Sequence, residues 1–120
     1  MEKKFNEPVI VTGVPRSGTS MVSGVFELCG AFGGKVCGAT PWNQKGQFEN
    51  REIIQNIQKP YMQRIGCCPL GQKNLPKPDD VVLDGNIREQ VLAVMASQGL
   101  QEDHIWYFKD CKAALTHQMW

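Results

Sequence analysis

The segment from residue 8 to residue 30 constrains the fold more than any other part of this sequence. It opens with Pro8-Val9-Ile10-Val11-Thr12, a short run of mostly apolar and β-branched residues. Such a run is typical of a strand that is buried on both faces of a parallel sheet. A glycine-containing loop follows, and then apolar residues repeat at helical spacing up to Gly30: Met21, Val22, Val25, Phe26 and Cys29. The order strand, loop, helix predicts an α/β domain in which helices flank a small, mostly parallel sheet.

The loop reads Gly13-Val14-Pro15-Arg16-Ser17-Gly18-Thr19-Ser20, and its two glycines have the spacing of a phosphate-binding loop. Glycine lets the backbone bend around a phosphate without a Cβ clash. The N–H groups of the loop and of the first helical turn can then point at the anion. A loop that binds ATP or GTP has Lys where this chain has Thr19. Because the cation here is Arg16, three residues earlier, the loop is poorly fitted to a γ-phosphate with magnesium and suits a different anion.

Two more helices and a second strand are predicted downstream. A helix beginning at Glu49 or Asn50 would carry apolar residues along one face, and Pro60 should kink or end it. Residues 66–80 are rich in Gly and Pro and are typical of a long loop. A third helix is expected from about Asn86 to Ser97. Ile105-Trp106-Tyr107-Phe108 has the composition of a buried strand, and a helical segment is expected from Ala113 onwards.

Composition and charge exclude several classes of function. The chain has 120 residues, which predicts a single domain over 1–120, and 13 Lys and Arg against 12 Asp and Glu give a net charge of +1. That balance argues against a nucleic-acid or membrane-surface partner. The sequence has no apolar run long enough for a membrane span and no signal-like apolar stretch near its start, so we expect a cytoplasmic protein. Its five cysteines match no zinc spacing and are expected to be reduced thiols, and we expect no metal.

Three segments resemble one enzyme family. Val14-Pro15-Arg16-Ser17-Gly18-Thr19-Ser20 resembles the 5′-phosphosulfate-binding loop of sulfotransferases, in which Pro and then Lys or Arg precede Ser-Gly-Thr. Lys45-Gly46-Gln47-Phe48-Glu49-Asn50 resembles a Lys-Gly-x-aromatic-Glu-Asn segment of bacterial and phage sulfotransferase-like proteins. The stretch from Trp106 to Thr116 resembles their strand followed by Lys-Asp-Pro-Arg-x-x-Leu-Thr. The resemblance implies a three-layer α/β fold of the P-loop nucleoside-triphosphate-hydrolase type.

The resemblance also implies a reaction, the transfer of a sulfuryl group from 3′-phosphoadenosine-5′-phosphosulfate (PAPS) to a hydroxyl or amine of an unknown acceptor. Arg16 would stabilise the charge that develops on the leaving oxygen. Glu49 is the first candidate for the general base. Asp110 is another catalytic candidate because it ends a predicted strand, although it could equally orient Lys109 or cap the last helix. The predicted donor site consists of Pro15, Arg16, Ser17, Gly18, Thr19, Ser20 and Lys109, with Trp42 or Phe48 as aromatic residues that could stack on adenine.

This sequence departs from the family pattern in two places. Cys111-Lys112 stand where Pro-Arg is expected, and no segment within 1–120 matches the Arg- and Ser-containing strand–loop that binds the 3′-phosphate in the family. We therefore expect the chain to correspond to the N-terminal portion of a longer family domain. Two other interpretations stay open. One is a P-loop phosphotransferase with an unorthodox loop, and the other is a truncated, non-catalytic module that forms homo-oligomers through an open sheet edge.

Overall fold

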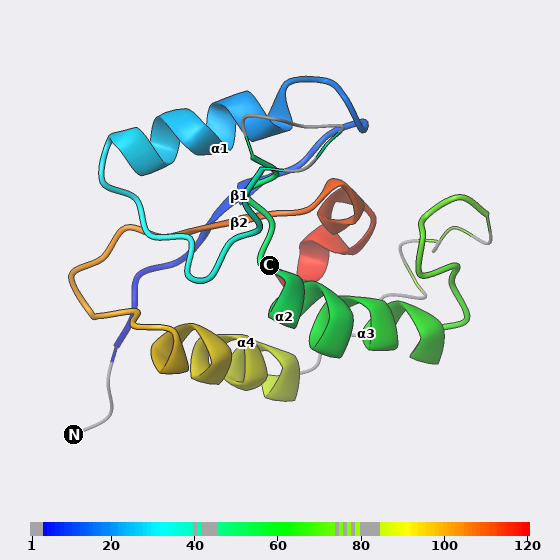
Figure 1. Ribbon diagram of the computed structural model, residues 1–120. Coiled ribbons are helices and arrows are strands. Elements are labelled where there is room, and N and C mark those ends of the chain that lie inside the picture. The colour runs from blue at the N-terminus through cyan, green and yellow to red at the C-terminus, as the bar shows by residue number, and fades with distance from the viewer. Residues whose placement is uncertain are drawn as a thin grey trace.

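Two strands form a small parallel sheet at the centre of the molecule (Figure 1). Strand β1 (Val9–Val11) pairs with strand β2 (Tyr107–Lys109), with Ile10 opposite Phe108. The computed structural model describes residues 4–39, 41, 46–73, 75, 77, 79 and 85–120, without the side chains of 117–119. Over these residues the chain is a mixture of helices and one two-stranded parallel sheet, which agrees with the predicted α/β class at this coarse level.

The two strands differ in how well they are covered. All three residues of β2 are buried, and Phe32 forms a single bridge to Trp106 on the side of β2 away from β1. Within the described ranges no strand pairs with the outer edge of β1, and Val9 and Ile10 are half-buried while Val11 is buried. The prediction of a second buried strand is therefore confirmed by β2. The first strand, which was expected to be buried on both faces, is buried only in part, because β1 has a neighbouring strand along one edge.

Helices cover both faces of this sheet. Figure 1 shows α1 (Thr19–Leu28) on one face and the other helices on the opposite face. The opposite layer contains a continuous helical stretch made of α2 (Arg51–Ile53), the π-helix η1 (Ile54–Gln58) and α3 (Lys59–Arg64). It also contains α4 (Gly85–Ser97), which matches the predicted third helix.

The helix predicted from residue 49 or 50 forms, but it does not end at Pro60. Asn50 caps its start, since the Asn50 side-chain oxygen accepts a hydrogen bond from the Ile53 N–H at 3.5 Å. Before Pro60 the backbone widens into the π-helix, and the Lys59 N–H bonds to the Ile54 carbonyl. Proline has no N–H to donate, so a wider turn that shifts the bonding pattern lets the helix continue past it.

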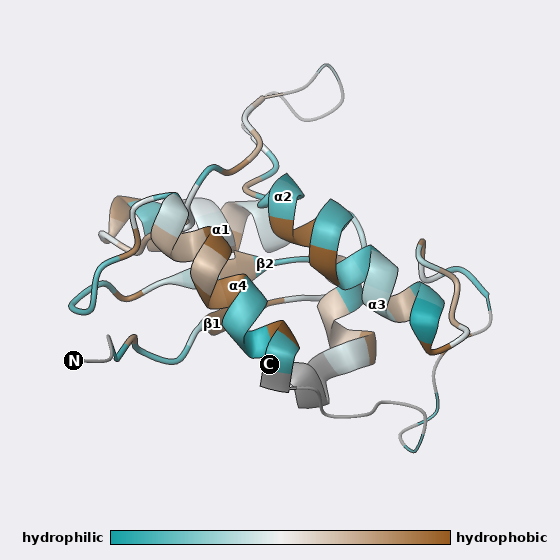
Figure 2. Ribbon diagram, turned by 90° about the horizontal axis from the view of Figure 1, so that it is seen from below, coloured by the Kyte–Doolittle hydropathy of each residue, from teal (hydrophilic) through white to brown (hydrophobic). Residues whose placement is uncertain are grey.

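Alternation along Trp106 and the three residues of β2 divides their side chains between the two layers. Trp106 and Phe108 belong to the core between the sheet and the α2–α4 layer, together with Ile53, Ile54, Ile57, Tyr61, Ile87, Val91, Met95, Leu100 and Ala113. In Figure 2, which views this layer from below, α2 and α4 each carry hydrophilic and hydrophobic residues, as expected for helices that cover a core. Tyr107 and Lys109 point the other way, towards α1, because neighbouring side chains of a strand face opposite sides.

Helix α1 packs on the sheet through small and polar residues. Thr19 and Ser23 are its buried residues, and the Tyr107 hydroxyl donates to the Glu27 carboxylate at 3.0 Å. Burial and this contact with Glu27 raise the pKa of Tyr107 well above its ordinary value. The apolar residues Met21, Val22, Val25 and Leu28 are exposed instead. The sequence pattern therefore predicts this helix correctly, but the structure turns these four apolar residues outward and leaves Phe26 half-buried.

The chain ends in the helical segment η3 (Cys111–Met119), which is of the 3-10 type and is interrupted at Thr116. The buried Thr116 hydroxyl accepts a hydrogen bond from the Gln58 amide at 2.8 Å, which attaches this segment to η1. Among the described residues, no helix combines the length and the apolar character that crossing a membrane requires.

Candidate functional site

An open pocket of about 330 Å³ lies where the loop after β1 and the end of β2 meet. It is lined by Pro15, Arg16, Gly18, Thr19, Ser20, Gln47, Glu49, Lys109 and Cys111. We call this the loop pocket. In a parallel sheet the carboxyl ends of the strands share one edge, which explains why the β1 loop and Lys109 come together. A second cavity, bordered by Phe5, Ile87 and Trp120 among others, measures only about 30 Å³, so the loop pocket is the better fit to a nucleotide-sized ligand.

The start of α1 supplies backbone donors to the loop pocket. Gly18 precedes the helix in a left-handed conformation (φ 99°), and no side chain caps the helix there. The first N–H groups of any α-helix lack partners within the helix, and α1 makes its first such bond from the Val22 N–H to the Gly18 carbonyl at 3.1 Å. Because Gly18, Thr19 and Ser20 all line the pocket, this helix end faces a space in which an anion would be stabilised.

Two residues with strained backbone flank the loop pocket. Arg16 has φ 66° and Phe48 has φ 58°, and in the described residues they are the non-glycine residues with positive φ. A side chain in this region costs on the order of 1 kcal/mol, and such residues cluster at functional sites. The Phe48 ring packs against Gly24 of α1, where an added Cβ would lie 3.2 Å from the ring. The turn at Phe48 directs Gln47 and Glu49 towards the pocket from outside the sheet.

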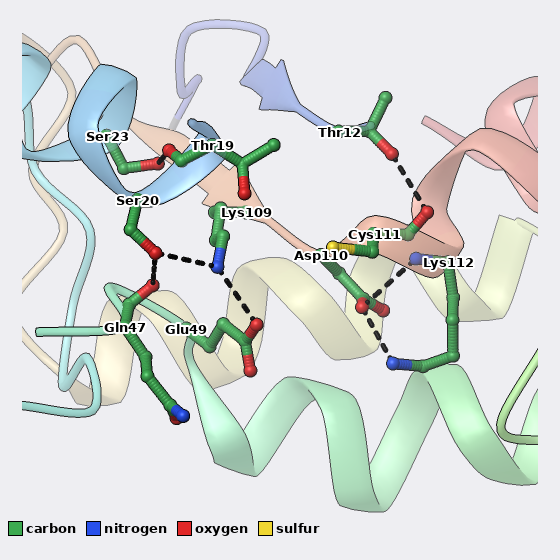
Figure 3. A network of polar contacts seen from close by, with 10 residues as sticks. All are labelled: Thr12, Thr19, Ser20, Ser23, Gln47, Glu49, Lys109, Asp110, Cys111 and Lys112. Carbon is green, nitrogen blue, oxygen red and sulfur yellow. Dashed lines mark hydrogen bonds and ion pairs between the residues drawn. The ribbon is translucent and has the colours of Figure 1, made fainter. Parts of the chain in front are cut away.

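A buried lysine links the three parts of the site (Figure 3). The Lys109 ammonium lies 3.0 Å from a Glu49 carboxylate oxygen and 3.3 Å from the Ser20 hydroxyl. The Lys109 side chain is 5% exposed and that of Glu49 is 28% exposed, so the carboxylate is the part of the pair that water reaches. The Ser20 hydroxyl also lies 3.5 Å from the Gln47 carbonyl. A loop, a helix and a strand end therefore meet at one cation.

Thr19 and Ser17, two residues predicted to donate hydrogen bonds from the loop, differ in burial. Thr19 is buried and lines the loop pocket, whereas Ser17 is exposed and is not among the lining residues. Both side chains crowd Gly13, because an added Cβ on that residue would lie 3.0 Å from the Ser17 hydroxyl oxygen and 3.3 Å from the Thr19 methyl carbon. A larger residue at position 13 would thus disturb the loop from inside.

Asp110 lies outside the loop pocket. It is 1% exposed, and one carboxylate oxygen accepts from the Lys112 backbone N–H at 3.2 Å and from the Lys112 ammonium at 2.8 Å. These contacts place it at the start of η3, which favours the helix-capping role that the sequence left open. Its second oxygen is buried and has no hydrogen-bond partner among the described residues. The proposed catalytic role of Asp110 stays a prediction without a contact to the pocket.

Sequence reasoning did not assign three residues that the structure places at the site. Gln47 and Cys111 line the loop pocket, and Thr12 joins the ends of the two strands. The Thr12 hydroxyl donates to the Cys111 carbonyl at 3.1 Å and accepts from the Ala114 N–H at 3.1 Å. The sequence signal for Thr12 and Cys111 was their position one and two residues, respectively, after the ends of the two parallel strands. Trp42 and Lys45 lie outside the described residues.

No protein-family model, curated protein or solved structure matches this chain. The resemblance to sulfotransferases therefore depends on the three sequence segments described above, and the geometry of the loop pocket is the independent observation to set beside them.

Proposed function

We propose that this protein is a sulfotransferase-like P-loop protein that binds PAPS in the loop pocket and transfers its sulfuryl group to a hydroxyl or amine. In this proposal the sheet and its flanking helices correspond to part of the three-layer fold of P-loop proteins. The observation that carries the proposal is the meeting of Ser20, Glu49 and Lys109. These residues come from three sequence segments that each resemble the family, and Lys109 contacts Glu49 at 3.0 Å and Ser20 at 3.3 Å.

The pocket has the charge that a phosphosulfate requires. Arg16 and Lys109 line it together with the uncapped start of α1, and Glu49 is the acidic residue among its lining side chains. Donors that are fixed before the ligand arrives stabilise an anion without reorganising. The arginine can hold two oxygens at once, which suits a tetrahedral phosphate or sulfate group.

The same residues can carry the transfer step. Glu49 would accept the proton of the acceptor hydroxyl as the oxygen attacks sulfur, so that a new O–S bond forms. The bond between sulfur and the bridging oxygen breaks, and its electron pair stays on the 5′-phosphate of the departing 3′-phosphoadenosine-5′-phosphate (PAP). Arg16 and Lys109 would stabilise that charge. Glu49 must first exchange its contact with Lys109, and an incoming anion offers Lys109 the replacement partner.

Binding of PAP, measured by calorimetry, tests the proposal. We expect the wild-type chain to bind PAP and Arg16→Ala to weaken it at least tenfold, since a charge-assisted bidentate contact is worth about 1.5–3 kcal/mol. The matched control is Arg88→Ala, because Arg88 pairs with Glu7 at the surface and does not line the pocket. Absence of PAP binding at millimolar ligand would refute the proposal. Tighter, magnesium-dependent binding of ATP would instead favour the phosphotransferase alternative.

A further inference from the structure

Helix α1 exposes four of its apolar residues and buries two small hydroxyl residues. The exposed fractions are 71% for Met21, 42% for Val22, 54% for Val25 and 90% for Leu28. We call these four residues the apolar stripe. On the opposite face, Thr19 and Ser23 are buried against the rest of the molecule. A surface helix normally has the reverse arrangement, with apolar residues inward and polar residues in water.

The apolar stripe is a continuous surface. Met21, Val25 and Leu28 are spaced by four and three residues and lie on one face of the helix, and Val22, three residues before Val25, borders that face. Val14 in the preceding loop is 74% exposed and Cys29 at the helix end is also exposed. Single exposed apolar residues are ordinary, but a row of this kind marks a contact surface.

The chemistry of the apolar stripe favours a second copy of the same chain. In a two-fold contact a residue close to the axis meets its own copy, so a charge there would face a like charge. None of the four stripe residues is charged. Their sizes also fit an antiparallel pair, because the smaller Val22 and Val25 lie in the middle and the larger Met21 and Leu28 at the ends. Small residues at the crossing point let two helices approach to about 8–10 Å.

Two other contacts are less suitable. A helix that lies on a membrane surface usually presents Lys or Arg on its polar face, whereas the polar face of α1 is buried. The open edge of β1 comprises three residues, and so short an edge offers few backbone hydrogen bonds to a neighbouring strand. The stripe is longer than that edge and more exposed.

We propose that α1 is the centre of a two-fold homodimer in which the apolar stripes of two chains pack antiparallel. The stripe exposes on the order of 500 Å² per chain, so a pair buries roughly 1,000 Å² and lies at the small end of specific interfaces. Weak, transient contacts lie at this end of the size range, so we expect a reversible dimer with a dissociation constant on the order of 1–100 µM. This contact is independent of PAPS binding.

Sedimentation velocity of the full chain tests this, over about 5–200 µM where such a dimer dissociates. We expect a concentration-dependent dimer that Val25→Asp converts to a monomer. The matched control is Leu75→Asp, because Leu75 is an apolar residue that is 55% exposed and lies outside α1. This control should leave the dimer intact. Because Val25 is exposed, the folded state should tolerate the aspartate, and circular dichroism melting verifies this.

A second measurement locates the contact. Val25→Cys under mild oxidation should give a disulfide-linked dimer on non-reducing gels, beyond any level seen with wild type or Leu75→Cys. A wild-type monomer at every concentration would overturn the proposal. So would a dimer that survives Val25→Asp, or binding to phospholipid vesicles that Val25→Asp abolishes while the chain in solution stays monomeric.

Discussion

Replacing Glu49 by Gln should change PAP binding and sulfuryl transfer in opposite directions. Glu49 holds the Lys109 ammonium at 3.0 Å and lines the same pocket, so in the unliganded protein it competes with an anion for that cation. Glutamine keeps the size and a hydrogen-bond acceptor but removes the negative charge. We therefore expect tighter PAP binding and, if Glu49 is the general base, loss of transfer.

The expected gain follows from the geometry. An anion oxygen in hydrogen-bond contact with Lys109 lies within about 6 Å of the Glu49 carboxylate oxygen, since each contact is about 3 Å long. Two unit charges at that separation repel by about 0.7 kcal/mol in water and by about 3 kcal/mol at an effective dielectric constant of 20. The pocket is open and salt screens the charges, so the lower part of this range applies, which corresponds to a three- to tenfold gain in affinity.

Calorimetry with PAP at fixed ionic strength measures this directly. Glu52→Gln is the matched control, because Glu52 belongs to the same helical stretch, accepts from Gln98 at 2.8 Å and does not line the pocket. It should leave the affinity unchanged. An unchanged or weaker affinity in Glu49→Gln, with a thermal melt near that of wild type, would refute the view that the carboxylate and the donor share Lys109.

Three further predictions concern stability and reactivity. The raised pKa of Tyr107 means that above about pH 10 the unfolded chain loses a proton that the folded chain keeps, so the free energy of unfolding should fall as pH rises. Tyr107→Phe should reduce this fall by up to about 1.4 kcal/mol per pH unit, as measured by denaturant titrations. Gly33→Ala should destabilise by about 2 kcal/mol or more in the same assay, because its Cβ would lie 2.5 Å from the Tyr107 ring. Hydrogen bonds from the backbone N–H groups of Gln72 and then Leu70 lower the pKa of Cys68. At neutral pH iodoacetamide should therefore modify Cys68 before the exposed Cys29, as mass spectrometry can measure, and equal rates would contradict this.

The parts of the site that follow from local pattern were predictable. The strand–loop–helix order specified the loop, and the shared carboxyl edge of parallel strands brought Lys109 to it. Glu49 reaches the pocket through a left-handed turn at Phe48, which no residue preference would have indicated. Asp110 differs from Lys109 because it follows the last residue of β2 and bonds to Lys112 at the start of η3, so its proposed catalytic role stays a prediction.

Which face of α1 is buried could not be predicted from the sequence pattern, for a different reason. Periodicity locates an apolar stripe but does not state what covers it. The inner face of α1 consists of small residues such as Ser23 and Gly24, and the Phe48 ring lies close to Gly24. The close approach of α1 to its neighbours thus depends on small side chains, and Met21, Val22, Val25 and Leu28 lie on the outer surface.

The pairing of β1 with β2 also has a consequence for how the chain folds. The Trp106 indole donates to the Asn6 carbonyl across 100 residues of sequence, so the sheet closes a loop almost as long as the whole chain. The entropy lost in closing such a loop must be met before the strands gain their contacts. Helices α1 and α4 can form locally, whereas the sheet, and with it the contact of Lys109 with Ser20, should form late. PAP would bind only the folded state, in which β1 and β2 are paired and Lys109 contacts Ser20. PAP should therefore slow unfolding more than it speeds folding.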